Sequence, residues 1–184
     1  MTELSLHVLD IAKNSTKAGA TLIEIEISED VGSNILTIEI TDNGCGMDKE
    51  FLSNVLDPFK TTRTTRKVGM GLSLLKNACE LTGGNLEITS EVGKGTKVKA
   101  TFVYDSIDRQ PVGDMASTIT ALIGGNDKTD FIYTHRYNDE QFVFSTLDIR
   151  KVLGVDVELS NIEVLDWIEG YINELTQNLY GGAL

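Results

Sequence analysis

Two neighbouring segments of this chain alternate apolar and polar side chains with a period of two. Thr21–Ile27 and Asn34–Ile40 show this pattern on either side of the polar turn Asp30–Ser33. Because successive side chains of a strand point to opposite faces, the pattern predicts two strands that each bury one face. An apolar sheet face has to be covered by a second layer, so the rest of the chain must supply one.

Other segments of residues 1–104 supply that layer and extend the sheet. Residues 2–18 repeat apolar side chains at steps of three and four, which predicts an amphipathic helix that ends at Gly19. Two further helices and two further strands are expected over Asp48–Leu56, Leu72–Leu81, Asn85–Ser90 and Thr96–Tyr104. This order predicts an antiparallel sheet with helices on one face, which is a two-layer α+β sandwich.

We expect one domain over residues 1–105 and a small α+β appendage over residues 106–184. The appendage is expected to contain a helix near Val112–Ile123, a hairpin over Asp130–Thr146 and a long helix over Ser160–Tyr180. The pattern predicts both elements of the hairpin and the apolar face of the long helix, and it indicates no internal repeat.

Four residues of this second part carry specific expectations. Ser160 and Glu163 have the spacing of a capping box at the start of the long helix. Trp167 is expected to anchor that helix to residues 1–105. His135 lies in a predicted strand, where a packed or surface role is expected rather than a site role.

The chain is acidic, and most of the excess charge lies in its second part. It carries 16 Lys and Arg against 28 Asp and Glu, with 11 against 15 in residues 1–106 and 5 against 13 in residues 107–184. Phosphate backbones and anionic lipid surfaces both require cations, so we expect neither nucleic acid nor a membrane as a partner. We expect a cytoplasmic protein whose acidic C-terminal region docks a protein partner, and a homodimer is compatible with the same sequence.

One face of the predicted N-terminal helix carries side chains suited to a nucleotide. Asp10, Asn14 and Lys17 follow one another at steps of about one turn, with Glu3 and His7 on the same side. A solvated polar face would produce the same pattern and is its more common cause. The functional interpretation is a cation for phosphate, an amide oxygen for Mg²⁺ and a carboxylate base, with Asp10 as the catalytic candidate.

A glycine-rich segment, Asp42–Met47, directly follows the second predicted strand. Its Asp-Asn-Gly start is common at hairpin tips, so turn formation alone would account for it. In the functional interpretation, a buried Asp42 at the strand end accepts a hydrogen bond from a purine amino group. Gly44 and Gly46 would let the backbone approach a flat ring, on which Met47 would pack.

A second glycine pair, Gly69 and Gly71, opens the predicted helix that follows it. Backbone N–H groups and the helix dipole at such a start suit a phosphate, although one Gly-x-Gly is common and no Walker loop follows. The preceding segment Lys60–Lys67 holds four cations and four threonines. A solvated loop would explain it. We interpret it as a lid that closes on phosphates, with Lys60 or Arg63 reaching the γ-phosphate.

Taken in order, these segments resemble the sequence boxes of the GHKL (Bergerat-fold) ATPases, which include gyrase, heat-shock chaperones, sensor histidine kinases and mismatch-repair ATPases. The matching segments are Asp10–Asn14, Asp42–Gly46, Gly69–Leu72 and Gly95–Thr96. The resemblance covers residues 1–104. It implies the Bergerat ATP-binding fold, with ATP and Mg²⁺ as cofactors.

The resemblance also implies a role for each matched residue. Asn14 would bind Mg²⁺, Asp42 would accept the adenine amino group, and Thr96 would support Asp42 through water. Residues 47–68 would form the ATP lid. It also implies Met47 against the base, and Gly69, Met70, Gly71 and Leu72 on the phosphates. The other candidate nucleotide-binding residues are Lys17 as a cation for phosphate, Gly44, Gly46, Lys60, Thr61 and Thr62.

Two branches of this superfamily share features with the chain. Asp57–Thr62 and Gly69–Ser73 resemble the histidine-kinase branch, whereas Asn14-Ser15 with Ala18–Thr21 resembles the mismatch-repair branch. We favour a kinase-like lid, because the acidic net charge opposes DNA binding. Asp10 replaces the usual glutamate and is one methylene shorter, so slow hydrolysis is expected.

The sequence therefore predicts an Mg-ATP-binding regulatory protein of the histidine-kinase-like type. It would phosphorylate a partner protein in trans, or hydrolyse ATP slowly to switch its own conformation. A noncatalytic ATP/ADP-sensing module is the alternative, and a mismatch-repair-like ATPase is a third hypothesis.

Overall fold

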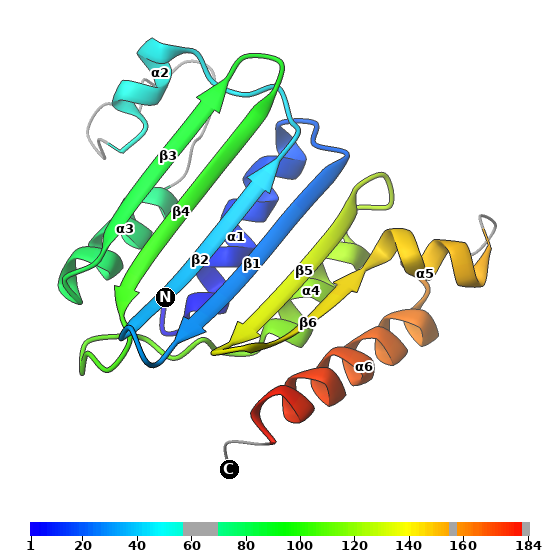
Figure 1. The fold of residues 1–184 in the computed structure, drawn as a ribbon. Coiled ribbons are helices and arrows are strands. Elements are labelled where there is room, and N and C mark those ends of the chain that lie inside the picture. The colour runs from blue at the N-terminus through cyan, green and yellow to red at the C-terminus, as the bar shows by residue number, and fades with distance from the viewer. Residues whose placement is uncertain (57–69, 155–157, 182–184) are drawn as a thin grey trace.

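The structure, a computed structural model, describes residues 1–56, 70–154 and 158–181. Within these ranges a six-stranded sheet has the order β3-β4-β2-β1-β5-β6, with helices packed behind it (Figure 1). In chain order the elements are α1 (Leu4–Lys17), β1 (Leu22–Asp30), β2 (Ile35–Asp42), α2 (Lys49–Asn54), α3 (Gly71–Leu81), β3 (Asn85–Glu91), β4 (Gly95–Val103), α4 (Met115–Gly124), β5 (Asp130–Tyr137), β6 (Glu140–Ser145), α5 (Thr146–Leu153) and α6 (Ile162–Tyr180).

The four strands of residues 1–105 form an antiparallel sheet, as their alternating patterns predict. β1 pairs with β2, β2 with β4, and β3 with β4. Their inward side chains, such as Ile25, Ile40 and Val98, are buried against α1 and α3. The predicted two-layer α+β architecture is confirmed.

β5 joins this same sheet by pairing in parallel with β1 over Leu22–Glu29. β6 then pairs with β5 in the antiparallel sense and forms one outer edge of the sheet. The sequence patterns predict the hairpin of β5 and β6 but not that it continues the sheet of residues 1–105. The division into residues 1–105 and 106–184 stays a prediction.

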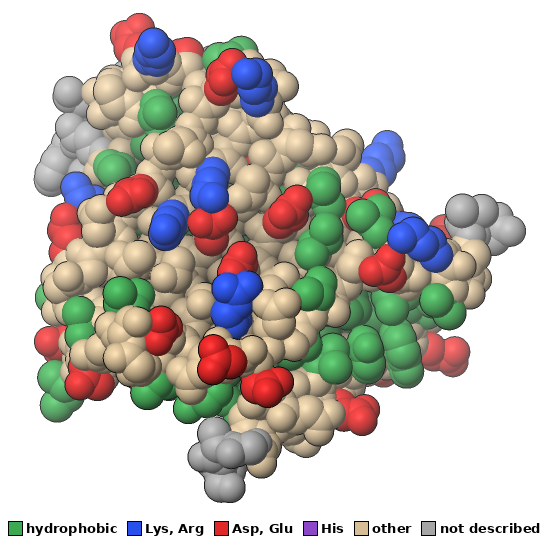
Figure 2. Space-filling model, in the orientation of Figure 1, with side chains coloured by type: hydrophobic (Ala, Val, Ile, Leu, Met, Phe, Trp, Pro, Cys, Tyr) green, Lys and Arg blue, Asp and Glu red, His purple; other side chains and the backbone are tan. Residues whose placement is uncertain are grey.

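The two faces of the sheet differ in chemistry. α1, α3 and α4 cover one face, and α6 packs against α4, β5 and β6. Figure 2 shows the other face, where acidic and basic side chains are interspersed over the central strands. One of its ion pairs joins Lys97 Nζ to Glu39 Oε1 at 2.6 Å across β4 and β2. The apolar core therefore lies entirely on the helical side, and so does the side chain of any inward-facing polar residue.

The segment that links β4 to α4 is tied to the start of α1. The backbone N–H groups of Leu4 and Ser5 donate to the carbonyls of Pro111 and Val112, at 2.9 and 2.8 Å. These bonds satisfy donors that a helix start leaves without partners inside the helix. The C-terminal part of the chain therefore holds the helix that carries Asn14.

α6 differs in two ways from its sequence prediction. Its N-cap is Asn161, whose side chain accepts from the N–H of Glu163 at 2.9 Å, so the capping box on Ser160 is wrong. Trp167 does not anchor the helix, because 52% of it is exposed; Ile168 is fully buried instead.

Over the described residues, no helix combines the length and apolarity that crossing a membrane requires.

Candidate nucleotide-binding site

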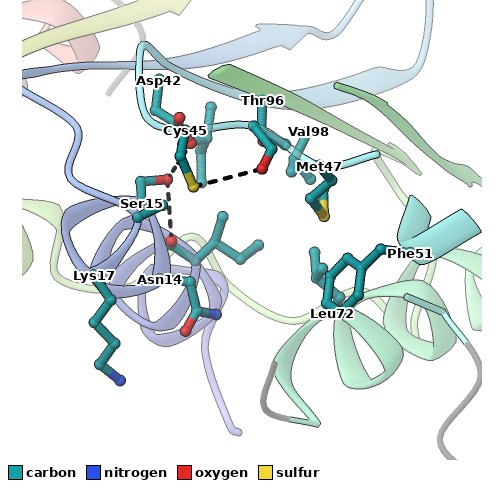
Figure 3. A pocket seen from close by; sticks show the side chains of 14 residues that line it. Asn14, Ser15, Lys17, Asp42, Cys45, Met47, Phe51, Leu72, Thr96 and Val98 are labelled. Carbon is teal, nitrogen blue, oxygen red and sulfur yellow. Dashed lines mark hydrogen bonds between the residues drawn. The ribbon is translucent and has the colours of Figure 1, made fainter. Parts of the chain in front are cut away.

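A cavity of about 410 Å³ lies between α1, the ends of β2 and β4, α2 and the start of α3 (Figure 3). The sequence-predicted residues that line it are Asn14, Lys17, Asp42, Gly46, Met47, Leu72 and Thr96. These residues come from four different segments of the chain. The structure therefore brings the first helix face, the first glycine box and the closing Gly-Thr pair to one place.

Asp42 is the buried anion of this cavity. It continues the inward-facing series of β2, after Ile38 and Ile40, so its carboxylate points to the helical side of the sheet. Its Oδ1 accepts from the N–H of Gly44 at 2.8 Å, and its Oδ2 accepts from Ser15 Oγ at 2.5 Å. Each carboxylate oxygen keeps a further lone pair, so the group can still accept a hydrogen bond from a donor group of a ligand.

Ser15 is a site residue that the sequence interpretation missed. It belongs to the buried stripe of α1 and is 5% exposed, yet its hydroxyl reaches Asp42 and it lines the cavity. The available signal was a polar residue within an otherwise apolar stripe, next to Asn14. A buried hydroxyl needs a hydrogen-bond partner, and the nearest strand end supplies one.

Glycines 46 and 95 hold the loop after β2 against the turn between β3 and β4. Gly46 has φ +67°, and a Cβ there would lie 2.0 Å from the carbonyl oxygen of Glu91. Gly95 has φ +112°, and its Cβ would lie 1.8 Å from the carbonyl oxygen of Asp42. No other residue type fits either position without moving the backbone. These glycines are therefore required by the walls of the cavity, whatever ligand enters it.

Ser90 of β3 joins Met47, in the loop after β2, to the start of β4, where Thr96 lies. Its Oγ accepts from the N–H of Met47 at 2.8 Å and lies 2.9 Å from both the carbonyl oxygen of Gly95 and Thr96 Oγ1. Thr96 stands opposite Asp42 in the β2–β4 register. The Met47 side chain is thereby held over the cavity, across from Ser15 (Figure 3).

Apolar side chains form the remaining walls. Phe51 of α2 and Leu72 of α3 lie on the side of the cavity opposite α1 (Figure 3). Ile11, Ile40 and Val98 line it from α1 and the sheet. Phe51 is a second site residue that the sequence did not reveal. The sequence predicts the short helix α2, but not which of its side chains faces the cavity. A space with one buried carboxylate and apolar walls suits a flat, amino-bearing ring.

Asn14 and Lys17 lie at the open side of the cavity. Both side chains extend from α1 in the same general direction, away from Asp42 (Figure 3). Lys17 is exposed and Asn14 is half-buried, so both can meet a ligand from solvent. Within the described residues, no group of three His, Cys, Asp or Glu is arranged to hold a metal ion. A metal here would depend on Asn14, water and oxygens of the ligand.

Asp10 lies next to the start of α3 rather than in the cavity lining. A Cβ built on Gly71 would fall 1.7 Å from Asp10 Oδ2, so glycine is what permits this contact. Met70, just before the helix, is 74% exposed and does not line the cavity. The predicted residues Lys60, Thr61, Thr62 and Gly69 lie outside the described part of the chain.

His7 lies on the polar side of α1 in the sequence pattern, and the structure packs it. It is 3% exposed, and its Nε2 lies 3.2 Å from Gln110 Oε1, while Nδ1 is buried without a hydrogen-bond partner. Burial lowers the pKa of His7, although the hydrogen bond to Gln110 opposes this shift. The ring is therefore part of the contact between α1 and the linker, and it does not line the cavity.

The sheet, the helical layer and the cavity define an ATPase domain of the GHKL class. The family model of histidine kinase-, DNA gyrase B- and HSP90-like ATPases matches residues 2–106, which is more than half of the chain, and the chain belongs to this family.

Two curated relatives and one solved structure give the range of similarity. The chain is 29% identical over 121 residues to the non-motile and phage-resistance protein of Caulobacter vibrioides, covering 62% of this chain and 14% of that protein. It is 32% identical over 95 residues to sporulation kinase D of Bacillus subtilis, covering 52% and 19%. The chain thus matches less than a fifth of these relatives' length.

A structure titled as the N-terminal domain of a DNA repair protein aligns with a TM-score of 0.53 at 20% identity, covering 84% of this chain and 58% of that one. This likeness concerns the fold. Its coverage exceeds that of the family model, so the shared fold extends past residue 106.

Proposed function

We propose that this chain binds Mg-ATP as a regulatory protein of the histidine-kinase-like type. In this proposal it transfers the γ-phosphoryl group to a partner protein, or it hydrolyses ATP slowly to switch its conformation. The observation that carries the proposal is the buried Asp42 carboxylate, held by Ser15 and Gly44 at the closed end of an apolar cavity. A carboxylate there accepts from the adenine amino group, while the apolar walls enclose the ring.

The phosphates would extend from the ring toward α1 and the start of α3. Asn14 offers an amide oxygen to Mg²⁺, which needs few protein ligands because it keeps waters and phosphate oxygens. Lys17 adds a cation, and the N-terminus of α3 adds backbone N–H groups and a favourable dipole. Asp10 lies beside Gly71 at this end, where a base for an attacking water or hydroxyl would be needed.

A noncatalytic ATP/ADP sensor is the second candidate function. It is favoured by the position of Asp10, whose short carboxylate lies against Gly71 and outside the cavity lining. A base has to lie within hydrogen-bond reach of the proton it removes, about 2.6–3.2 Å. In this version the nucleotide changes the conformation of the chain without being consumed.

Calorimetric titration with ATP, with and without Mg²⁺, tests the shared part of both proposals. Asn14→Ala should abolish the Mg²⁺ dependence of ATP affinity, and Lys17→Ala should weaken binding. Lys13→Ala is the matched control, because this exposed lysine belongs to the same helix but does not line the cavity. Absence of ATP binding in the wild type would refute the proposal.

Incubation with γ-labelled ATP and cell extract then separates the two candidates. Labelled protein bands that disappear with Asn14→Ala indicate a kinase, and release of free phosphate indicates an ATPase. Asp10→Asn should stop either reaction while leaving ATP affinity within about twofold, because the carboxylate lies outside the cavity lining. Unchanged ATP in every sample would leave the sensor as the correct function.

A further inference from the structure

The outward side of α6 presents two aromatic rings to solvent. Trp167 is 52% exposed and Tyr171 is 37% exposed, and their rings stack at 5.4 Å between centroids with an interplanar angle of 8°. They are four residues apart, so they lie on one side of the helix, and the buried residues Ile168 and Ile172 hold the other side. Neither ring is among the residues of the buried core.

Carboxylates stand at both ends of this aromatic pair. Glu163 precedes Trp167 by four residues and Glu174 follows Tyr171 by three, so all four side chains form one stripe along the helix. Both carboxylates are exposed. We call Glu163, Trp167, Tyr171 and Glu174 the α6 stripe. Figure 2 shows hydrophobic side chains gathered where Figure 1 places β6 and α6, with acidic side chains around them.

α6 itself contains no Lys or Arg to balance its carboxylates. The sequence has no Lys or Arg after residue 151. The nearest preceding cations in the sequence are already engaged: Arg150 Nε lies 3.0 Å from Asp130 Oδ1, and Lys151 Nζ lies 2.8 Å from Asp148 Oδ1. Aromatic faces and carboxylates both attract Lys and Arg side chains, the rings through their quadrupoles. A second copy of this chain would bring the same negative charge and be repelled.

We propose that the α6 stripe docks a cationic, apolar segment of a partner protein. Lys or Arg side chains of that segment lie over Trp167 or Tyr171 and pair with Glu163 and Glu174, while its apolar residues cover the rings. Exposed Trp and Tyr are the residue types that most often dominate binding energy at protein interfaces. This inference goes beyond nucleotide binding and does not depend on it.

Intrinsic fluorescence tests the proposal directly, because Trp167 is the single tryptophan of the chain. The probe is a synthetic helical peptide of leucine and lysine, titrated into the full-length protein. We expect saturable quenching or a blue shift that weakens as salt rises. A peptide of leucine and glutamate with the same spacing serves as the opposite-charge control and should produce no change.

Charge-removing variants then locate the binding site. Glu163→Gln with Glu174→Gln should weaken binding of the leucine–lysine peptide about twofold to thirtyfold, the sum of two exposed ion pairs. Asp127→Asn with Asp139→Asn removes the same charge from exposed positions outside α6 and should leave the affinity unchanged. Tyr171→Ala keeps the reporter and should also weaken binding.

Several results would overturn the proposal. These are no fluorescence change with the cationic peptide, equal changes with the acidic peptide, or equal loss of affinity in both charge-removed pairs. Self-association on sedimentation that Tyr171→Ala abolishes would mean that a second copy occupies the stripe instead. ATP titration of the same variants should be unchanged, so a failure here is distinct from a failure of nucleotide binding.

Discussion

At the scale of single residues, two carboxylates end the inward-facing series of neighbouring strands. Asp42 follows Ile40 on β2, and Glu29 follows Ile27 on β1. Because the strands are antiparallel, these two anions lie at opposite ends of the sheet. One faces a cavity and the other is enclosed by protein. The same sequence pattern therefore produces a candidate binding group at one end and a structural contact at the other.

Asp42→Asn tests the binding role. The amide retains one acceptor, but its NH₂ group faces either Ser15 Oγ or the N–H of Gly44, both of which donate to the carboxylate. A hydrogen bond to a charged group contributes about 1.5–3 kcal/mol, so we expect ATP affinity to fall about tenfold to a hundredfold. Calorimetry measures this loss. Ser15→Ala should cost less, because it removes a support and leaves the acceptor; a larger effect of Ser15→Ala would contradict this assignment.

His7 predicts a pH dependence of stability. Burial lowers its pKa below 6.5, helped by the N-terminal amino group and opposed by Gln110 and Asp10. As pH falls below 6.5, His7 binds a proton in the unfolded chain but stays neutral in the folded chain. The free energy of unfolding therefore falls, by at most about 1.4 kcal/mol per pH unit. Urea unfolding of wild type and His7→Leu between about pH 7 and pH 5.5 measures this. An identical slope in the variant would contradict it.

Helical periodicity predicts part of the candidate site at this scale. A step of three or four residues places Asn14 and Lys17 on one side of α1, and the structure has them there, at the cavity. The same step also places His7 on this side, but periodicity does not show that the linker residue Gln110 covers that end of the helix. Ser15 was missed for the related reason that its partner, Asp42, is 27 residues away.

At the scale of elements, the C-terminal end of α6 is fastened to the sheet by a buried polar cluster. The Tyr180 hydroxyl donates to Glu29 Oε1, which also accepts from His135 Nε2 at 2.9 Å, and Tyr133 OH lies 2.8 Å from His135 Nδ1. Burial alone would raise the pKa of Glu29. The hydrogen bonds from His135 and Tyr180 outweigh it, so the pKa lies below the ordinary 4.5.

Tyr180→Phe should lower the free energy of unfolding at neutral pH by about 1–3 kcal/mol, because it leaves a buried carboxylate with one donor fewer. The contribution of Glu29 is fully present above pH 4.5 and is lost as pH falls through its lower folded pKa, so the deficit should shrink in acid. Urea unfolding followed by circular dichroism measures both. Tyr171→Phe, on the exposed side of α6, is the control and should change little. A deficit independent of pH would exclude the Glu29 contact as its cause.

Most elements could be predicted from local pattern, because each depends on residues close in sequence. β1, β2 and the hairpin of β5 and β6 all appear near their expected ranges. The start of α6 was misplaced because Ser160 and Asn161 are both good caps, and backbone geometry decides between them. Trp167 was expected inside because tryptophan is apolar, yet the buried stripe of α6 runs through Ile168 and Ile172.

At the scale of the whole molecule, the parallel pairing of β1 with β5 joins the family-matched part to the rest. β1 pairs with β2 on one side and β5 on the other, and α4 packs against α1. No local pattern specifies which strands become neighbours, since pairing is chosen by the whole fold. A boundary near residue 105 follows from charge and motif content, whereas hydrogen bonding runs across it.

Hydrogen bonding that runs across residue 105 predicts cooperative unfolding. β5 pairs with β1 and α4 packs against α1, so the chain should unfold in one transition. Circular dichroism and Trp167 fluorescence should then give the same midpoint. If ATP binds as proposed, saturating Mg-ATP should raise both midpoints equally, although Trp167 is not part of the cavity. A fragment of residues 1–106 should lose stability, because it exposes Ile23 and Ile25 beside an unpaired edge of β1. Two separate transitions, or a stable monomeric fragment, would show instead that residues 1–105 fold independently.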